Sequence, residues 1–175
     1  LEYAYDDWTI AQMANVMGEQ EDYKTFIERS QNYINVFDPT TKFMRGRFRN
    51  TWFAPFDPYE VNFNYTEANS WQYSFYVPHD ITGFMNLLGG KDQLEKQLDD
   101  LFIADDKTSG REQADITGLI GQYAHGNEPS HHIAHLYNFV GQPWKTQGLT
   151  DQIMKELYFN NPNGLFRRCS RGNDI

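Results

Sequence analysis

The chain has 175 residues, of which 39% are hydrophobic and 16% aromatic, and 24 acidic against 15 basic residues give it a formal charge of −9. This length suffices for one domain with a substantial core, and the acidic balance excludes a nucleic-acid partner, which requires a basic face. The single cysteine, Cys169, allows no internal disulfide, no signal peptide opens the chain, and no apolar run approaches the ~20 residues of a membrane span.

The sequence of the first third of the chain predicts two helices. The first extends from Leu1 to Gly18, because glycine commonly follows a helix C-terminus, and we expect one apolar face: Tyr3, Trp8, Ile10, Met13, Val16 and Met17. The second begins at Glu19 or Glu21 and ends at Val36, with these side chains inward: Tyr23, Phe26, Ile27, Tyr33 and Ile34. Since no capping residue precedes the first helix, we expect a part of a larger protein with both flanks missing.

Turns and loops alternate with further helices after Val36. We expect a turn over residues 37–47. The alternating Arg45, Arg47 and Arg49 indicate a loop or a short extended piece. The segment Trp52–Tyr65 is rich in aromatic residues and proline, and we expect an ordered binding loop there. Loops are also expected over 104–113 and Gly118–Ser130. The remaining predicted helices are Asn69–Val77, His79–Leu88, Lys91–Phe102, Ser130–Phe139 and, from Lys145 or Thr146, a last one to Phe159. No stretch alternates like a strand, so we expect an all-α chain, part of an α/α barrel or toroid, with a helix bundle as the competing architecture.

One acid, Glu67, lies in an aromatic stretch, Tyr65–Asp80. Trp71 and its aromatic neighbours offer flat apolar faces, and Asn69, Ser70 and Gln72 offer hydrogen bonds, a combination that suits a sugar ring. A carboxyl group beside aromatic rings is partly desolvated, and this raises its pKa, as a general acid requires. The alternative is structural: Thr66 or Asn69 caps a helix, and the aromatic side chains pack into the core.

A second group of polar residues spans Gly121–His135. The spacing of His131 and His135 fits a zinc pair on a helix, but the glutamate of the zincin motif is missing between them. The side chains of Gln122, Asn127 and Glu128 carry hard oxygen ligands of the kind that calcium prefers. Alternatively, Asn127 and Glu128 shape the turn before Pro129, and the histidines form hydrogen bonds in the core.

The chain resembles glycoside hydrolase family 92, the calcium-dependent, inverting exo-α-mannosidases, from Leu1 to about Gly164. The motifs that carry this resemblance are Leu1-Glu-Tyr-Ala-Tyr-Asp-Asp-Trp, Phe43-Met-Arg-Gly-Arg, Tyr65-Thr-Glu-Ala-Asn-Ser-Trp-Gln-Tyr, Val77-Pro-His-Asp, Gly118-Leu-Ile-Gly-Gln-Tyr-Ala-His-Gly-Asn-Glu-Pro-Ser-His-His and Gly141-Gln-Pro-Trp-Lys-Thr-Gln. The resemblance implies an (α/α)6 catalytic barrel, incomplete here, beside an N-terminal β-rich domain that this chain lacks. It also implies a mannose-containing glycan as substrate and a secreted or periplasmic location.

By the same resemblance, Glu67 is the general acid, His125 contacts the leaving sugar, and Asn127 with Glu128 helps to build the calcium site. Trp71, with its flat aromatic face, is a further candidate for binding the substrate. Two departures bear on specificity: Ala68 stands where the family commonly has glycine, and Gly126 stands where α-1,2-specific members have an acid, which leaves the linkage open. The tail, 165–175, diverges, and only Gly172-Asn173-Asp174 echoes the segment that carries the catalytic base. We therefore expect a mannosidase fragment that is inactive alone. The alternative is a non-catalytic carbohydrate-binding or helical scaffold fragment.

Overall fold

The computed structural model of the chain describes residues 1–162 and 164, so the predicted divergent tail and Asp174 lie outside the described residues. The described part is mostly helical. Its α-helices are α1 (Glu2–Met17), α2 (Gln20–Arg29), α3 (Ser70–Tyr73), α4 (Ile81–Leu88), α5 (Lys91–Ile103) and α6 (Pro143–Leu157). Its 3-10 helices are η1 (Ser30–Val36), η2 (Glu128–Ser130) and η3 (Ile133–Asn138).

Short strands correct the all-α expectation. Within residues 1–162, eight two-residue strands form four pairs: β1 (Phe37–Asp38) with β2 (Phe43–Met44), β3 (Arg47–Phe48) with β4 (Thr51–Trp52), β5 (Glu60–Val61) with β6 (Ser109–Gly110), and β7 (Leu119–Ile120) with β8 (Tyr123–Ala124). The β5–β6 pair is parallel and the other pairs are antiparallel. Two residues are too few to produce the alternation from which strands are recognised in a sequence.

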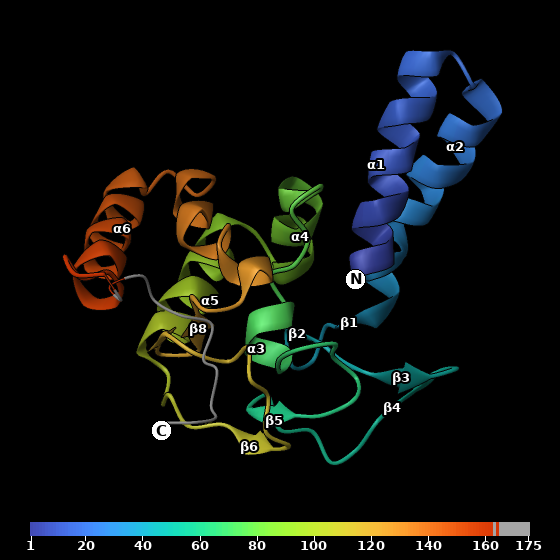
Figure 1. Cartoon of the computed structure of the whole chain (residues 1–175). Helices are drawn as coiled ribbons and strands as arrows, with labels where there is room; N and C mark the ends of the chain where they lie inside the picture. The colour runs from blue at the N-terminus through green and yellow to red at the C-terminus, as the bar shows by residue number, and fades with distance from the viewer. Residues whose placement is uncertain (163, 165–175) are drawn as a thin grey trace.

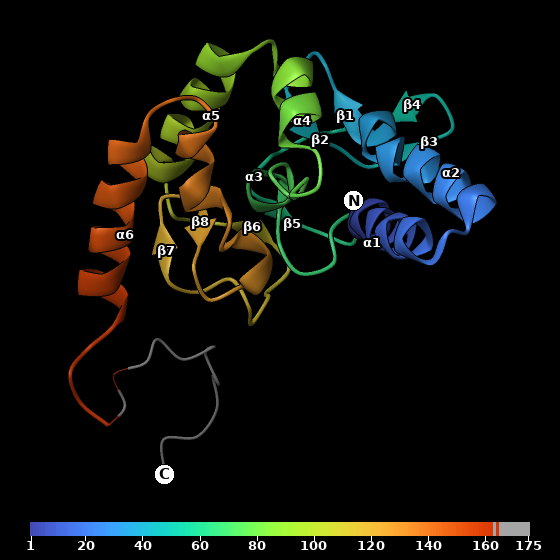
Figure 2. The ribbon, with the colours of Figure 1, turned by 90° about the horizontal axis from the view of Figure 1, so that it is seen from above.

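The helices form a curved row rather than a ring. The antiparallel pair of α1 and α2 stands at one end of the row, α3 and α4 lie in the middle, and α5 and α6 lie at the other end (Figures 1 and 2). The described helices do not form a closed barrel, and the prediction was of an incomplete part of one. In this part no helix has the length and apolar character needed to cross a bilayer.

The buried face of α1 differs from the predicted one. Its fully buried positions are small or charged: Ala4, Asp7, Ala11 and Ala14. The three alanines allow close approach to α2, and Arg29 pairs with Asp7 across the helix pair at 3.1 Å. By contrast, Tyr3 and Val16 are each 83% exposed, and Ile10, Met13 and Met17 are exposed as well. Of the predicted apolar face of α1, only Trp8 is partly buried, with its ring 6.5 Å from that of His79.

The second predicted helix is also shorter and buries less. It becomes the α-helix α2 up to Arg29 and the 3-10 helix η1 beyond it, where the Ser30 hydroxyl donates to Ile27 O at 2.7 Å. Of its predicted inward residues Tyr33 is buried, whereas Ile34 is exposed.

The core lies under α3, α4 and α5. Phe75 and Phe84 meet edge to face at 6.0 Å, and α5 contributes Leu94, Leu98 and Leu101, all fully buried. The predicted helix Asn69–Val77 shrinks to α3, and turn hydrogen bonds from Tyr76 N–H to Tyr73 O and from Val77 N–H to Phe75 O replace the helix beyond it. The predicted helix Ser130–Phe139 consists of 3-10 turns in η2 and η3.

Candidate active site

The predicted loops Trp52–Tyr65 and Gly118–Ser130 meet at Asn69, the residue that caps α3. Asn69 Oδ1 accepts from the backbone N–H of Gln72, and the Gln72 side chain accepts from the Asn69 N–H, which completes a capping box. The Asn69 amide also donates to Tyr59 O at 3.4 Å and to Gln122 Oε1 at 2.9 Å. One buried side chain therefore joins the loop before α3 to the loop after β7.

The neutral polar side chains of α3 serve the fold. Asn69, Ser70 and Gln72 are all buried. Ser70 Oγ donates to Met44 O at 2.9 Å, and Gln72 Nε2 donates to Gln122 O at 3.0 Å. These residues were candidates for sugar hydrogen bonds, and the structure supports the alternative in which they cap and anchor α3.

Glu67 lies in the bend between β5 and α3 and is partly buried. No hydrogen bond or ion pair to another described residue engages its carboxylate. Its neighbour is Tyr73: burial raises the pKa of the Tyr73 hydroxyl, a hydrogen bond to Glu2 raises it further, and the negative charge of Glu67 adds to this shift. Glu67 thus has a carboxylate without a hydrogen-bond partner among the described residues, close to Tyr73, and its role as the general acid stays a prediction.

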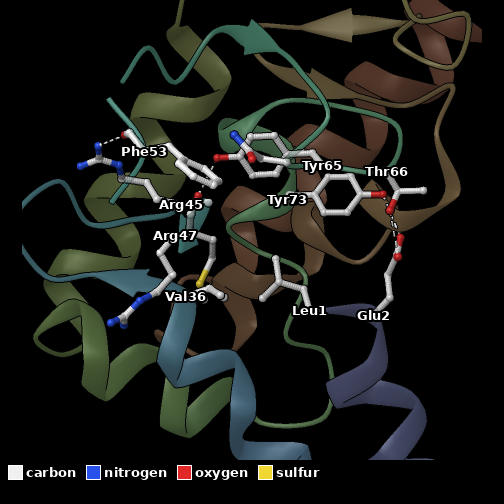
Figure 3. Close-up of a pocket in the computed structure, with 12 residues that line it drawn as sticks. Leu1, Glu2, Val36, Arg45, Arg47, Phe53, Tyr65, Thr66 and Tyr73 are labelled. Carbon is white, nitrogen blue, oxygen red and sulfur yellow. Dashed lines mark hydrogen bonds between the residues drawn. The ribbon is translucent and has the colours of Figure 1, made fainter. Parts of the chain in front are cut away.

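A cavity of about 260 Å³ opens beside this bend (Figure 3). It is lined by Leu1, Glu2, Val36, Met44, Arg45, Gly46, Arg47, Phe53, Asn64, Tyr65, Thr66 and Tyr73. Thr66 lines it directly and Glu67 follows in the chain. Aromatic faces and hydroxyl, amide, guanidinium and carboxylate groups surround one space there, a lining that can bind a polar ring.

Trp71 lies at a different cavity, one of about 210 Å³ that it shares with Phe43 and the start of α5. Its ring meets Phe43 edge to face at 4.8 Å and Tyr59 at 5.9 Å. The indole Nε1 is buried without a hydrogen-bond partner among the described residues. The structure therefore does not bring Trp71 to the cavity beside Glu67.

His125 follows β8 and lies between two tyrosines. Tyr123 OH is 2.9 Å from Nδ1 and Tyr158 OH is 2.8 Å from Nε2, so both ring nitrogens are engaged. The imidazole stacks on His131 with ring centres 4.8 Å apart. Burial lowers the pKa of His125, and the neighbouring His131 lowers it further, which favours the neutral ring. His125 does not line the cavity that Thr66 lines.

The predicted calcium ligands differ in their surroundings. Asn127 is 1% exposed, and its Oδ1 is buried without a hydrogen-bond partner among the described residues. A buried, unpaired amide oxygen is unfavourable unless a ligand satisfies it, so this atom fits a hard cation. Glu128 is exposed in η2. Gln122 Oε1 already accepts from Asn69, so its side chain is committed to the fold.

The zinc alternative loses its geometric basis. His131 and His135 lie in η2–η3, a region of 3-10 turns, where three residues per turn do not place positions four apart on one face. His131 Nε2 instead lies 2.9 Å from His125 O. The described residues contain no group of three or more histidine, cysteine, aspartate or glutamate side chains arranged to hold a metal.

Two residues next to the Glu67 bend escaped sequence reasoning. The carboxylate of Glu2 accepts from Thr66 Oγ1 at 3.0 Å and from Tyr73 OH at 2.9 Å, and Arg111 donates to Thr66 O at 3.1 Å. The only sequence signal for Glu2 is its place in the Leu1–Trp8 motif. Nothing in the sequence connects Arg111 with Thr66.

The comparisons identify the family. The model of the glycosyl hydrolase family 92 catalytic domain matches residues 1–174, so the chain belongs to glycosyl hydrolase family 92. Within it, the chain is similar to the solved GH92 α-mannosidase BT3965 of Bacteroides thetaiotaomicron, with 42% identity and a TM-score of 0.83 over 95% of this chain. The GH92 inverting mannosidase BT2199 of the same organism shares 32% identity, with a TM-score of 0.79 over 94% of the chain.

A curated relative is more distant. An uncharacterized secreted glycosidase of Arthroderma benhamiae is 26% identical over an alignment of 167 residues that covers 82% of this chain. The chain spans only part of each relative: 22% of BT3965, 24% of BT2199 and 19% of the fungal protein.

Proposed function

We propose that the chain is part of an inverting, calcium-dependent exo-α-mannosidase that hydrolyses terminal α-mannosides of glycans. Family membership and two solved relatives described as mannosidases support this reaction class. The observation that carries the proposal is that the Glu67 carboxylate has no hydrogen-bond partner among the described residues, while the residue before it, Thr66, lines a cavity with polar and aromatic walls. The remainder of the (α/α)6 barrel and an N-terminal β-rich domain would complete the enzyme.

In this reaction Glu67 is the general acid. Its proton passes to the glycosidic oxygen as the bond to the anomeric carbon breaks. Water attacks that carbon from the opposite face and loses a proton to a second carboxylate, which inverts the configuration. Inverting enzymes hold the two carboxyl groups ~6.5–9.5 Å apart to admit this water. The base belongs outside the described residues, so the isolated chain is proposed to be inactive.

Calcium is proposed as the cofactor, with Asn127 Oδ1 as a ligand from this chain and Glu128 as a nearby acidic contributor. The buried, unpaired oxygen of Asn127 supports its part. When bound, calcium would supply positive charge that orients sugar hydroxyls. Because calcium takes six to eight oxygen ligands, most of its ligands would come from water, substrate and other segments.

His125 and Trp71 are proposed to bind the substrate. The two tyrosine hydroxyls on His125 fix its ring orientation. Trp71 lines the separate cavity of about 210 Å³, so its contact would be with a part of the glycan away from the cavity that Thr66 lines. A secreted or periplasmic location is proposed as well, because one relative is named a secreted glycosidase.

The test is a Glu67→Gln variant of the natural protein that contains this sequence, expressed at its full length. General acid catalysis contributes roughly 10²–10⁴-fold, so turnover of an alkyl mannoside should fall by about that factor. An aryl mannoside with an acidic leaving group needs less protonation and should lose much less. The melting temperature reports on folding, and Glu21→Gln, an exposed position on α2, is the matched control.

Equal activity of Glu67→Gln and parent on both substrates would mean that another residue is the acid. A parent protein that binds mannosides but turns none over would support the alternative of a non-catalytic carbohydrate-binding module.

A further inference from the structure

Thr66, the residue before Glu67, is held from two sides. Its hydroxyl donates to Glu2 Oε2 at 3.0 Å, and its carbonyl oxygen accepts from Arg111 Nη2 at 3.1 Å. Glu2 belongs to the first turn of α1, whereas Arg111 directly follows β6. Side chain and backbone of Thr66 are therefore fixed by oppositely charged groups from distant parts of the sequence.

The Glu2 side of this arrangement extends to α3. Glu2 Oε1 accepts from Tyr73 OH at 2.9 Å, so one carboxylate binds both the bend and the helix that follows it. Figure 3 shows the Glu2 carboxylate facing the Thr66 hydroxyl, with the Tyr73 hydroxyl directed toward the same place. Tyr73 is buried and cannot follow a moving bend, so Glu2 ties Thr66 to a fixed point.

The Arg111 side reaches the beginning of the same bend. The Arg111 guanidinium lies over the Phe63 ring at 5.0 Å, and its backbone N–H donates to Val61 O at 2.9 Å. Arg111 Nη1 donates to Gln113 Oε1 at 2.8 Å, which orients the guanidinium. Arg111 thus contacts the bend at Val61, Phe63 and Thr66, and spans the segment that leads to Glu67.

We propose that Glu2 and Arg111 are positioning residues that fix the bend through Thr66 and so aim the carboxylate of Glu67 at the glycosidic oxygen. This inference rests on the proposed role of Glu67 as the acid. Its physical basis is that Glu67 has no hydrogen-bond partner of its own among the described residues, so the backbone of the bend, held at Thr66, is what fixes the point from which its side chain extends. Proton transfer requires placement within a fraction of an ångström, and a displacement of ~1 Å can cost about 10²-fold in rate.

The experiment compares Arg111→Gln, Arg111→Lys and Thr66→Val with the parent protein at its full natural length. Arg49→Gln is the matched control, since exposed Arg49 also lies over a phenylalanine ring, that of Phe48 at 5.3 Å. Hydrogen exchange of the 62–69 segment is measured by mass spectrometry. The kcat and KM values are measured for an alkyl mannoside and for an aryl mannoside with an acidic leaving group.

We expect Arg111→Gln and Thr66→Val each to speed exchange of the 62–69 segment. Each should also lower kcat for the alkyl mannoside about ten- to a hundredfold, with little change in KM and a smaller loss for the aryl mannoside. Arg111→Lys, which keeps a donor for Thr66 O, should recover most of both effects. Arg49→Gln should match the parent.

Parental exchange and parental kcat in both Arg111→Gln and Thr66→Val would overturn the proposal. Equal losses on the two substrates that follow the melting temperature would overturn it too, because they would indicate a general structural role. If the parent hydrolyses no mannoside, the proposed function fails, while the exchange rates still decide whether Glu2 and Arg111 hold the bend.

Discussion

At the scale of single residues, the side-chain oxygen of Asn127 indicates a ligand site. Its backbone is fixed in the turn before η2, where its N–H donates to Ala124 O and its carbonyl accepts from the Ser130 N–H. Its side-chain oxygen, in contrast, has no hydrogen-bond partner among the described residues. Leaving such a group unpaired costs roughly 1–3 kcal/mol, so an occupant that satisfies it would stabilise the fold.

If calcium is that occupant, Asn127→Ala should weaken calcium binding by the protein at its full natural length. Loss of a group that merely supports a ligand typically costs 10–100-fold in affinity, so loss of a direct ligand should cost at least about tenfold. Isothermal titration calorimetry with calcium measures it, with exposed Asn86→Ala as the control. Identical calcium affinity in Asn127→Ala and parent would remove Asn127 from the site.

At the scale of elements, the β7–β8 hairpin depends on one glycine. Gly121 lies in its turn with φ +58°, and a Cβ there would approach Leu101 O to 2.3 Å. The backbone N–H of Gln122 donates to the same Leu101 O at 2.8 Å, which attaches the hairpin to α5. The close approach and the left-handed backbone both require glycine at this position.

Gly121→Ala should therefore lower the free energy of unfolding by about 1–3 kcal/mol or more. Gly148→Ala is the counterpart, because Gly148 lies inside α6 and a Cβ there would meet no atom of the described chain within 4 Å. That change should raise the free energy of unfolding by about 0.5–1 kcal/mol through helix propensity. Urea denaturation of both variants tests the pair, and equal stability of the two would contradict it.

At the scale of the whole molecule, partly buried histidines make stability depend on pH. Burial lowers the pKa of His79, His125 and His132 from the ordinary value of 6.5. His132 is the most enclosed of them, with Nε2 2.7 Å from Phe75 O. The folded state therefore binds fewer protons than the unfolded state below pH 6.5, and its stability falls as the pH falls.

We expect the free energy of unfolding to decrease from about pH 7.5 to 5.5, by up to ~1.4 kcal/mol per pH unit for each proton taken up on unfolding. His132→Gln should flatten this dependence, and His135→Gln, at an exposed position, should leave most of it. Denaturant unfolding at several pH values measures the slope. An unchanged slope in His132→Gln would show that this histidine does not contribute.

The sequence by itself determined the family, the order of most helices and the candidate acid, because these depend on local patterns. Gly18 and Gly89 adopt the left-handed backbone predicted for residues that end helices, and Glu67 lies in a bend beside Tyr73. The bounds of α1, α4, α5 and α6 lie close to the predicted ones, since each helix has a clear apolar period or a glycine or proline at one end.

Only the tertiary structure decided which faces are buried and which residues meet. In α1 the alanines face α2 because small side chains let the two helices approach closely. Hydrophobicity alone would predict that Ile10 is buried and not Ala11, whereas the structure shows the opposite. The hydrogen bonds from Thr66 to Glu2 and from Arg111 to Thr66 join positions 64 and 45 residues apart. Such pairs form because folding brings the ends of distant elements together. A local sequence pattern does not show which distant residues come into contact.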